Sequence, residues 1–430
     1  MALSVRDAAQ YAFDVVAGEV VSCKWVKLAC KRFIDDLENG EKRGITFDAD
    51  DAQYALDFYD LTTHVKGDLA GQPIDLEPWQ GFIIINLFGW KWESNGKRRF
   101  NTAYSEVARK NAKSTLSSGI GLFMAGFDGE GGAEVYSAAT TRDQARIVFN
   151  DARMMAQKSP ILRRRFGVYR NNIHVEANAS KFEPLSADAN TLDGLNVHCA
   201  IIDELHAHKT REVYDVMETA TGARSQPLLF NITTAGFNRQ GICYEVREYA
   251  TKVLEGTVDD DTLFAVIYTL DEGDDWKDEA TWIKANPNLG VSVSWNDIRR
   301  LAKKAVEMPT ARNNFLTKRL NVWVNAETAW LNMEKWHKCQ APADEAHLKT
   351  LPCYIGLDLA NKLDVAAMIG VFPDGKNYHI VCKFWLPENQ IYHKPGAIGN
   401  LYDTWSKQGI LTLTDGDTID HDHIEDDIRA

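Results

Sequence analysis

The sequence lacks any Cys-x-x-Cys pair, and its seven cysteines are an odd number. An odd count excludes pairing of every cysteine within the chain, so we expect reduced, mostly buried thiols in an intracellular compartment. Long apolar runs are also absent, and the longest, residues 82–90, is far too short to cross a bilayer. The charged residues Arg6 and Asp7 precede no apolar region, which does not fit a signal peptide. We therefore expect a soluble protein with no membrane partner.

Positive charge is scarce as well. The chain has 48 Lys and Arg against 61 Asp and Glu, a net charge of −13. Because phosphate neutralisation by Lys and Arg dominates duplex affinity, this balance excludes a protein that coats nucleic acid, although local basic surfaces remain possible. An apolar content of 45% is ordinary for a globular protein, and 430 residues suffice for two or three domains.

What the chain does have is a strand, a tight turn and a helix around Lys113. Residues 101–107 form the apolar strand, and the helix that follows carries a periodic apolar face: Leu116, Ile120, Leu122 and Phe123. Lys113 and Ser114 stand where a phosphate-binding loop places a lysine on the β- and γ-phosphates and a hydroxyl on Mg²⁺. Val107 and Ala112 replace two usual glycines, so an ordinary basic helix start is the alternative interpretation.

Two later strands end in polar groups. Residues 199–204 are apolar up to Asp203 and Glu204, as expected for a buried parallel strand that enters a nucleotide crevice. There Asp203 would hold Mg²⁺, usually through water, and Glu204 would orient and deprotonate the attacking water. A solvated loop start is the alternative for this strand alone. Residues 228–236 end in Thr233, Thr234 and a glycine turn, where a γ-phosphate sensor would lie.

Together, residues 108–114, 192–196 with 201–204, and 233–236 resemble the ATPase motifs of the large terminase subunit of tailed phages, the motor that packages DNA into proheads. A loop with Arg109 in place of a glycine-rich start is typical of that family. The resemblance implies an α/β P-loop ATPase with a central, mostly parallel sheet that binds ATP and Mg²⁺. It also implies that Arg109 contacts phosphate, and that Thr233 and Thr234 couple hydrolysis to movement.

The segment before the motor strand contains Pro78, Trp79 and Gln80. It is similar to the adenine-recognising glutamine motif of the same family, so Gln80 would read the base by its amide. The alternative is a buried helix in which Trp79 and Gln80 only pack and cap, with proline in its first turn.

A second domain is expected from about residue 350. A strand with an inward Asp358, a second strand ending near the turn Asp374-Gly375, and a third strand resemble the start of a ribonuclease H-like nuclease. There Asp358 would be the first ligand of a two-metal site for Mg²⁺ or Mn²⁺; the alternative is a carboxylate that caps a turn. The acidic residues 415–427 fit the first turn of a helix begun at Asp420 better than a metal cage. We therefore expect a truncated nuclease domain, and we do not expect endonuclease activity from this chain.

The expected domains are an N-terminal helical segment (1–65), the P-loop ATPase motor (66–270), a tryptophan-rich helical linker region (271–349) and the incomplete nuclease domain (350–430). The resemblance implies double-stranded DNA, a portal protein, a small terminase subunit and further copies in a homo-oligomeric ring as partners. It also implies action in the cytoplasm of the infected bacterial host, not as a component of the virion.

Several residues have two interpretations. His206 and His208 beside the carboxylates are not expected to bind metal, because Mg²⁺ prefers oxygen ligands. Arg224 is either an arginine finger or part of a structural salt bridge, and the basic residues 163–165 either touch DNA or end a solvated helix. Two rival functions are another nucleic-acid translocase, such as a helicase, and a non-catalytic DNA- or capsid-binding scaffold.

Overall fold

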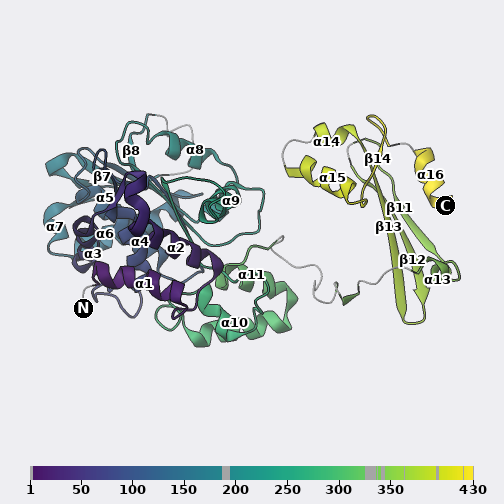
Figure 1. The fold of residues 1–430 in the computed structure, drawn as a ribbon, viewed down its shortest axis with the longest axis horizontal. Coiled ribbons are helices and arrows are strands. Elements are labelled where there is room, and N and C mark those ends of the chain that lie inside the picture. The colour runs from purple at the N-terminus through teal and green to yellow at the C-terminus, as the bar shows by residue number, and fades with distance from the viewer. Residues whose placement is uncertain are drawn as a thin grey trace. The chain divides into compact units, whose positions relative to one another are not determined.

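The computed structural model describes residues 3–185, 194–324, 336, 338–339, 344–362, 364–393, 397–419 and 421–429. The chain forms two units, Met1–Leu331 and Asn332–Ala430 (Figure 1). Asp193 of the second motif, the predicted helix start at Asp420 and Trp330 of the linker lie outside the described residues.

The N-terminal part of the first unit is helical, as predicted. Its elements are α1 (Val5–Ala17), α2 (Lys24–Asn39), a 3-10 turn (Gly40–Arg43), β1 (Ile45–Phe47), α3 (Ala49–Asp57), a second 3-10 turn (Phe58–Leu61), α4 (Pro78–Gly89) and β2 (Trp90–Trp92). Ser4 caps α1 by accepting from the N–H of Asp7. The antiparallel pair β1–β2 is not predicted by the sequence pattern. The buried faces of these helices join the core of the main sheet, and the ring of Phe82 lies 6.2 Å from that of Phe264.

The main sheet has eight strands in the order β10-β3-β9-β8-β4-β7-β6-β5. The strands are β3 (Thr102–Glu106), β4 (Glu134–Ala138), β5 (Gly167–Val168), β6 (Ile173–Val175), β7 (Ser180–Leu185), β8 (Val197–Asp203), β9 (Leu228–Thr233) and β10 (Leu263–Ile267). All neighbours from β10 to β7 are parallel, and only β6 and β5 pair antiparallel. The central, mostly parallel sheet is therefore confirmed, and its fully buried strands β8, β9 and β10 explain their unbroken apolar sequences.

Helices cover this sheet (Figure 1). They are α5 (Lys113–Gly126), α6 (Arg142–Lys158), α7 (Leu162–Arg165), α8 (Glu212–Thr219) and α9 (Ile242–Leu254). Helices α5 and α6 pack on each other and on β4 and β7, whereas α9 contacts β3 and β10. At Gly121 a Cβ atom would lie 2.6 Å from the Phe182 ring. A glycine at that position therefore lets α5 approach the sheet closely.

The segment after β10 forms a small helical layer with its own core. It contains a 3-10 helix (Glu279–Lys284), α10 (Trp295–Glu307) and α11 (Pro309–Arg319). Its buried side chains include six that the helical spacing and the tryptophan content predict: Trp282, Ile298, Ala302, Ala305, Phe315 and Leu320. Leu289 and Val293 are also buried but were not predicted, and Leu301 and Leu316 are only partly buried. This layer lies within the first unit, because its loops hydrogen-bond to the segment that follows β3.

A buried ion cluster holds the start of β3. Arg98 donates two hydrogen bonds of 2.9 Å to Asp128, and Nε2 of His198 lies 2.7 Å from the same carboxylate. Burial alone would raise the pKa of Asp128, but Arg98 and His198 outweigh it and lower the pKa to about 2. Since the carboxylate is ionised when paired, its contribution to stability is present above pH 4 and is lost as the pH falls through 2.

We expect acid to remove about 2 kcal/mol from the free energy of unfolding through Asp128 alone. Unfolding measured between pH 5 and pH 2 should show a shallower pH dependence in Asp128→Asn than in the wild type. The exposed change Glu19→Gln is the control and should leave the slope as it is. Parallel curves for wild type and Asp128→Asn would contradict the assignment.

The second unit is a four-stranded sheet in the order β11-β12-β13-β14. Its elements are α13 (Glu345–Leu348), β11 (Tyr354–Asp358), β12 (Ala366–Asp374), β13 (Asn377–Pro387), α14 (Asn389–His393), α15 (Ala397–Lys407), β14 (Thr412–Thr414) and α16 (His421–Arg429). The predicted hairpin turn after Asp374 is confirmed by the pairing of Asp374 with Asn377. The predicted inward position of Asp358 is wrong, because all five residues of β11 are exposed.

No disulfide bond joins the seven cysteines, and four of them are buried: Cys23, Cys30, Cys199 and Cys243. Within the described ranges, no helix combines the length and the apolar character needed to cross a membrane.

Candidate functional site

The loop of residues 107–112 joins β3 to α5 at the carboxyl end of the sheet. Lys110 and Ala112 have φ of 76° and 56°, in the left-handed region that glycine usually occupies. The side chain of Asn111 is fully buried and donates to the carbonyl of Ala108 and to Oδ1 of Asn286, both at 3.0 Å. The hydrogen bonds of Asn111 thus stabilise a loop whose positive φ angles are usually provided by glycine.

Lys113 is the first residue of α5 and lies folded over this loop. Its ammonium nitrogen is 3.1 Å from the carbonyl oxygen of Val107 and 3.3 Å from that of Ala108. Burial lowers the pKa of Lys113, while the charges of Glu204 and Asp203 act in the opposite direction. The ammonium is therefore close enough to interact electrostatically with the carboxylates of Asp203 and Glu204. Ser114 follows it, partly exposed, in the first turn.

Asp203 and Glu204 lie at the carboxyl end of β8, one strand away from β3 with β9 between them. Burial, together with the neighbouring charge of Glu204, raises the pKa of Asp203 to about 7. Burial also raises the pKa of Glu204, but a hydrogen bond from His206 and the charges of Lys113 and Arg109 outweigh this effect and lower the pKa to about 2. Glu204 is therefore ionised at neutral pH and can accept a hydrogen bond from water.

The residues present fit a divalent cation at Asp203. Its carboxylate accepts a backbone hydrogen bond of 3.0 Å from Glu204 and is buried next to this second carboxylate, so a bound cation would offset negative charge there. A carboxylate and the hydroxyl of Ser114 are the oxygen donors that Mg²⁺ prefers. Asp203 and Ser114 are therefore the residues that would hold the ion.

His206 connects Glu204 to the end of β9 and to α11. Its Nδ1 lies 3.1 Å from a carboxylate oxygen of Glu204 and 3.0 Å from the hydroxyl oxygen of Thr233, while its Nε2 lies 2.8 Å from the ammonium of Lys318. The carbonyl of Thr233 in turn accepts from the N–H of Val107 at the start of the loop. The contact of His206 with Glu204 is not visible in the sequence.

Arg109 faces the helical layer. Its backbone N–H donates to the carbonyl of Lys318 at 2.9 Å. Beside it lies a pocket of about 290 Å³ whose charged lining residues are all basic: Arg109, Lys110, Lys304, Lys318 and Arg319. Arg109 is thus next to a strongly cationic surface that adjoins the phosphate loop.

Gln80 lies in the first turn of α4, where its side-chain oxygen accepts from the N–H of Glu77 at 3.0 Å and caps the helix. Trp79 beside it donates from Nε1 to Asn288 at 2.5 Å. These are the packing and capping roles of the alternative interpretation.

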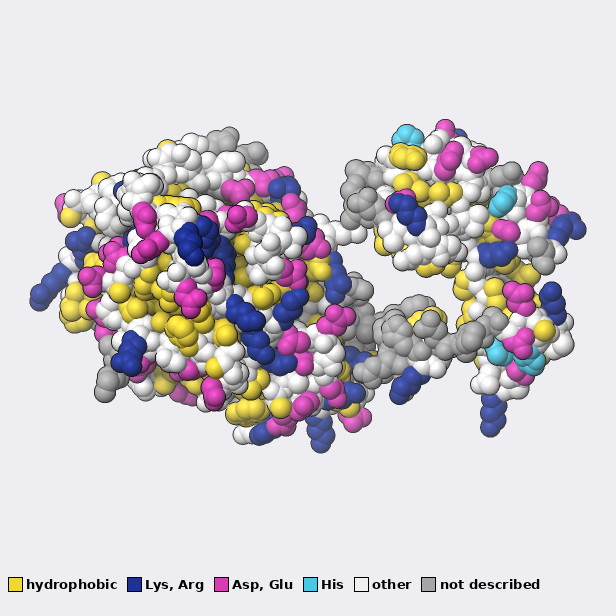
Figure 2. All heavy atoms as spheres, viewed as in Figure 1, with side chains coloured by type: hydrophobic (Ala, Val, Ile, Leu, Met, Phe, Trp, Pro, Cys, Tyr) yellow, Lys and Arg dark blue, Asp and Glu magenta, His cyan; other side chains and the backbone are white. Residues whose placement is uncertain are grey.

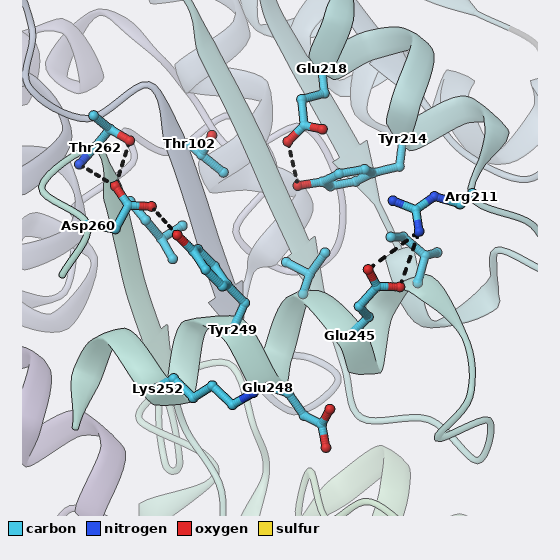
Figure 3. Close-up of a pocket in the computed structure, with 13 residues that line it drawn as sticks. Thr102, Arg211, Tyr214, Glu218, Glu245, Glu248, Tyr249, Lys252, Asp260 and Thr262 are labelled. Carbon is cyan, nitrogen blue, oxygen red and sulfur yellow. Dashed lines mark hydrogen bonds and ion pairs between the residues drawn. The ribbon is translucent and has the colours of Figure 1, made fainter. Parts of the chain in front are cut away.

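Another pocket lies elsewhere. It encloses about 500 Å³ between α8, α9 and the amino-terminal ends of β3 and β10, and Figure 3 shows Tyr214 and Tyr249 on opposite sides of it. Because the loop and the carboxylates of β8 follow the carboxyl ends of their strands, this pocket is separate from them.

Arg224 pairs with Glu130 at 3.1 Å and donates to the carbonyl of Gly132, which confirms its structural interpretation.

The expected nuclease ligand Asp358 is not part of a metal-sized group of three ligand side chains among the described residues; the group found there consists of His347, Asp374 and His379. The two-metal site around Asp358 stays a prediction.

The fold and the loop define the class: a P-loop nucleotide hydrolase with a lysine loop after β3 and an Asp-Glu pair after β8, in a chain with a second, mixed sheet. Family models agree. The model described as terminase large subunit, ATPase domain, matches residues 78–252, and that for the terminase large subunit endonuclease domain matches residues 257–429. The chain belongs to the terminase large subunit family. The match to the endonuclease model begins at residue 257, before the predicted linker region of residues 271–349.

Individual relatives support the same family. Protein YmfN of Escherichia coli K12 is 38% identical over 248 residues, which are 55% of this chain and 54% of that protein. The terminase large subunit of Enterobacteria phage HK97 is 28% identical over 377 residues, 84% of this chain and 70% of that protein. The crystal structure of the HK97 large terminase matches with a TM-score of 0.56 at 25% identity, over 88% of this chain and 77% of the other. The aligned part thus spans about half the length of YmfN.

Proposed function

We propose that this chain is the ATP-hydrolysing motor subunit that moves double-stranded viral DNA into proheads. The observation that supports this most directly is the buried Lys113 at the start of α5, with the carboxylates of Asp203 and Glu204 near enough to affect its pKa. The loop before Lys113 follows β3 and the two carboxylates stand at the end of β8, with β9 between these strands. Phosphoryl transfer to water requires three groups: a lysine that neutralises phosphate charge, a carboxylate that holds Mg²⁺ and an ionised carboxylate that accepts the proton of water.

In this proposal Lys113 and Arg109 bind the phosphates of ATP, and Ser114 and Asp203 hold Mg²⁺, which neutralises charge on the phosphates when bound. Glu204 accepts the proton of the attacking water. Thr233 ends β9 and Thr234 follows it. Because the carbonyl of Thr233 accepts from the N–H of Val107 in the loop, a displacement of the loop by the phosphates would move this strand end. Gln80 would contact the base through the part of its amide that does not cap α4.

The proposed partners are double-stranded DNA, a portal protein, a small terminase subunit and further copies of the chain in a ring. The proposed location is the cytoplasm of the infected bacterial host, outside the virion. Metal-dependent cleavage of concatemeric DNA, with Asp358 as one ligand of Mg²⁺ or Mn²⁺, is proposed for the complete family protein. It is not assigned to the residues described.

Steady-state ATP hydrolysis by this chain, with and without linear duplex DNA, tests the proposal. Hydrolysis that increases with duplex DNA is the expected result. No hydrolysis above that of a Lys113→Ala variant, at protein concentrations that permit a ring, would instead favour the non-catalytic scaffold.

Lys318 is expected to act as a positioning residue for this reaction. Because Lys318 contacts His206, which touches both Glu204 and Thr233, Lys318→Met should reduce kcat by about tenfold through a misplaced Glu204 and leave the KM for ATP nearly unchanged. Lys304→Met, in the same basic pocket but with no recorded contact to His206, is the matched control. Equal losses in the two variants, or a rise in KM alone, would show that Lys318 acts only through the charge of the pocket.

A further inference from the structure

Three side chains with nitrogen and oxygen ligand atoms meet in the second unit, at the end of the hairpin of β12 and β13. They are His347 from α13, Asp374 at the end of β12 and His379 on β13. In Figure 2 cyan and magenta spheres adjoin at the place where Figure 1 shows α13 beside this hairpin. All three side chains are 39–45% exposed, so ions in solution can reach them.

The distances between the ligand atoms match those around a small divalent ion. Nε2 of His347 lies 3.0 Å and Nε2 of His379 lies 3.3 Å from the same oxygen of Asp374, and the three atoms lie within 4.8 Å of one another. A tetrahedral zinc ion with bonds of about 2.0 Å keeps its ligand atoms about 3.3 Å apart. Small rotations of these side chains would therefore suffice to bind one ion.

The backbone fixes the three residues before any ion binds. Asp344 caps α13 by accepting from the N–H of His347, whose carbonyl accepts from Thr350. Asp374 pairs with Asn377 across the two-residue turn, and His379 pairs with Phe372 on β12. Because all three positions lie on paired or capped backbone, binding would cost little conformational entropy.

We propose that His347, Asp374 and His379 form a binding site for one divalent transition-metal ion of the zinc class. Two imidazoles and one carboxylate suit such an ion better than Mg²⁺ or Ca²⁺, which prefer oxygen ligands. The fourth position would be open to water. A bound metal ion would link α13 to the hairpin. The site is separate from Asp358: Tyr354 at the start of β11 pairs with Val371 on the turn side of β12, whereas Asp358 at the other end of β11 pairs with Ala367. The inference does not depend on the proposed motor function.

Titration of the full chain with CoCl₂ and ZnCl₂ tests the site. We expect one Co²⁺ per chain with the visible absorption of tetrahedral cobalt, displaced by Zn²⁺, and a rise in the unfolding temperature of the second unit. Binding should fall by at least about tenfold in His379→Ala and in Asp374→Asn. Because these side chains are exposed, both variants should keep the wild-type circular dichroism spectrum.

His423→Ala is the matched control, since His423 also lies near a carboxylate, 3.9 Å from Asp427, but is not part of a group of three ligands among the described residues. Its cobalt binding should equal that of the wild type. Absence of binding in the wild type would overturn the proposal. So would binding that persists in both site variants, or a thiolate-to-cobalt absorption band, which would assign the ion to the exposed cysteines Cys339, Cys353 or Cys382.

Discussion

Replacing Glu204 with Gln is expected to reduce ATP turnover by about a hundredfold to ten-thousandfold, the usual range for loss of a general base. Gln keeps the size of the side chain but cannot accept the proton of water. In the structure Glu204 is ionised at neutral pH, because His206, Lys113 and Arg109 outweigh the effect of burial and hold its pKa at about 2. Since Lys113 and Ser114 remain, binding of ATP should persist in this variant.

The measurement is single-turnover and steady-state hydrolysis beside a titration with a fluorescent ATP analogue. Glu218→Gln is the matched control, since Glu218 contacts Tyr214 in the large pocket away from the loop and should leave turnover unchanged. A Glu204→Gln turnover within about threefold of the wild type would remove Glu204 from the reaction. Joint loss of binding and turnover would show a structural defect instead.

The order of elements in the motor was accessible from sequence, since the relevant strands are short, wholly apolar and end in polar residues. Residues 199–204 illustrate this: β8 is buried throughout and ends at Asp203. The small pair β1–β2 was missed because each strand has three residues, too few for a periodic pattern. The exposure of Asp358 was missed for another reason. A strand pattern shows which residues share a face, but not whether another element covers that face.

The candidate site was only partly accessible. Lys113, Asp203 and Glu204 carry local patterns that indicate their chemistry, whereas Asn111, His206 and Lys318 act through contacts between segments distant in sequence. Nothing near Lys318 in the sequence points to residue 206, because the contact exists only after α11 packs beside the loop. Gln80 shows the reverse case: its motif was visible, yet its oxygen caps its own helix.

Glu106 is the clearest residue that the sequence pattern could not identify. It is fully buried at the end of β3 and accepts hydrogen bonds from Tyr104 at 2.5 Å and from Asn321 and Trp323 at 3.2 Å each. A nitrogen of Arg247 lies 3.3 Å away. One carboxylate thus joins β3, α9 and the segment after α11, and its removal leaves a guanidinium without its counter-charge in the core.

We expect Glu106→Ala to lower the free energy of unfolding of the first unit by about 3–5 kcal/mol, the usual cost of breaking a buried ion pair from one side. Glu106→Gln keeps the volume and one acceptor, so it should cost less than Glu106→Ala. Glu248→Ala, an exposed change on α9, should stay within about 0.5 kcal/mol of the wild type. Denaturant unfolding gives the total effect, and hydrogen exchange in residues 101–107 and 228–235 localises it. Because Asn321 also accepts from the N–H of Ala235, beside Thr234, exchange should increase at the end of β9 as well as in β3. An increase confined to β3 would show that Glu106 stabilises its own strand but does not hold the sensor segment in place.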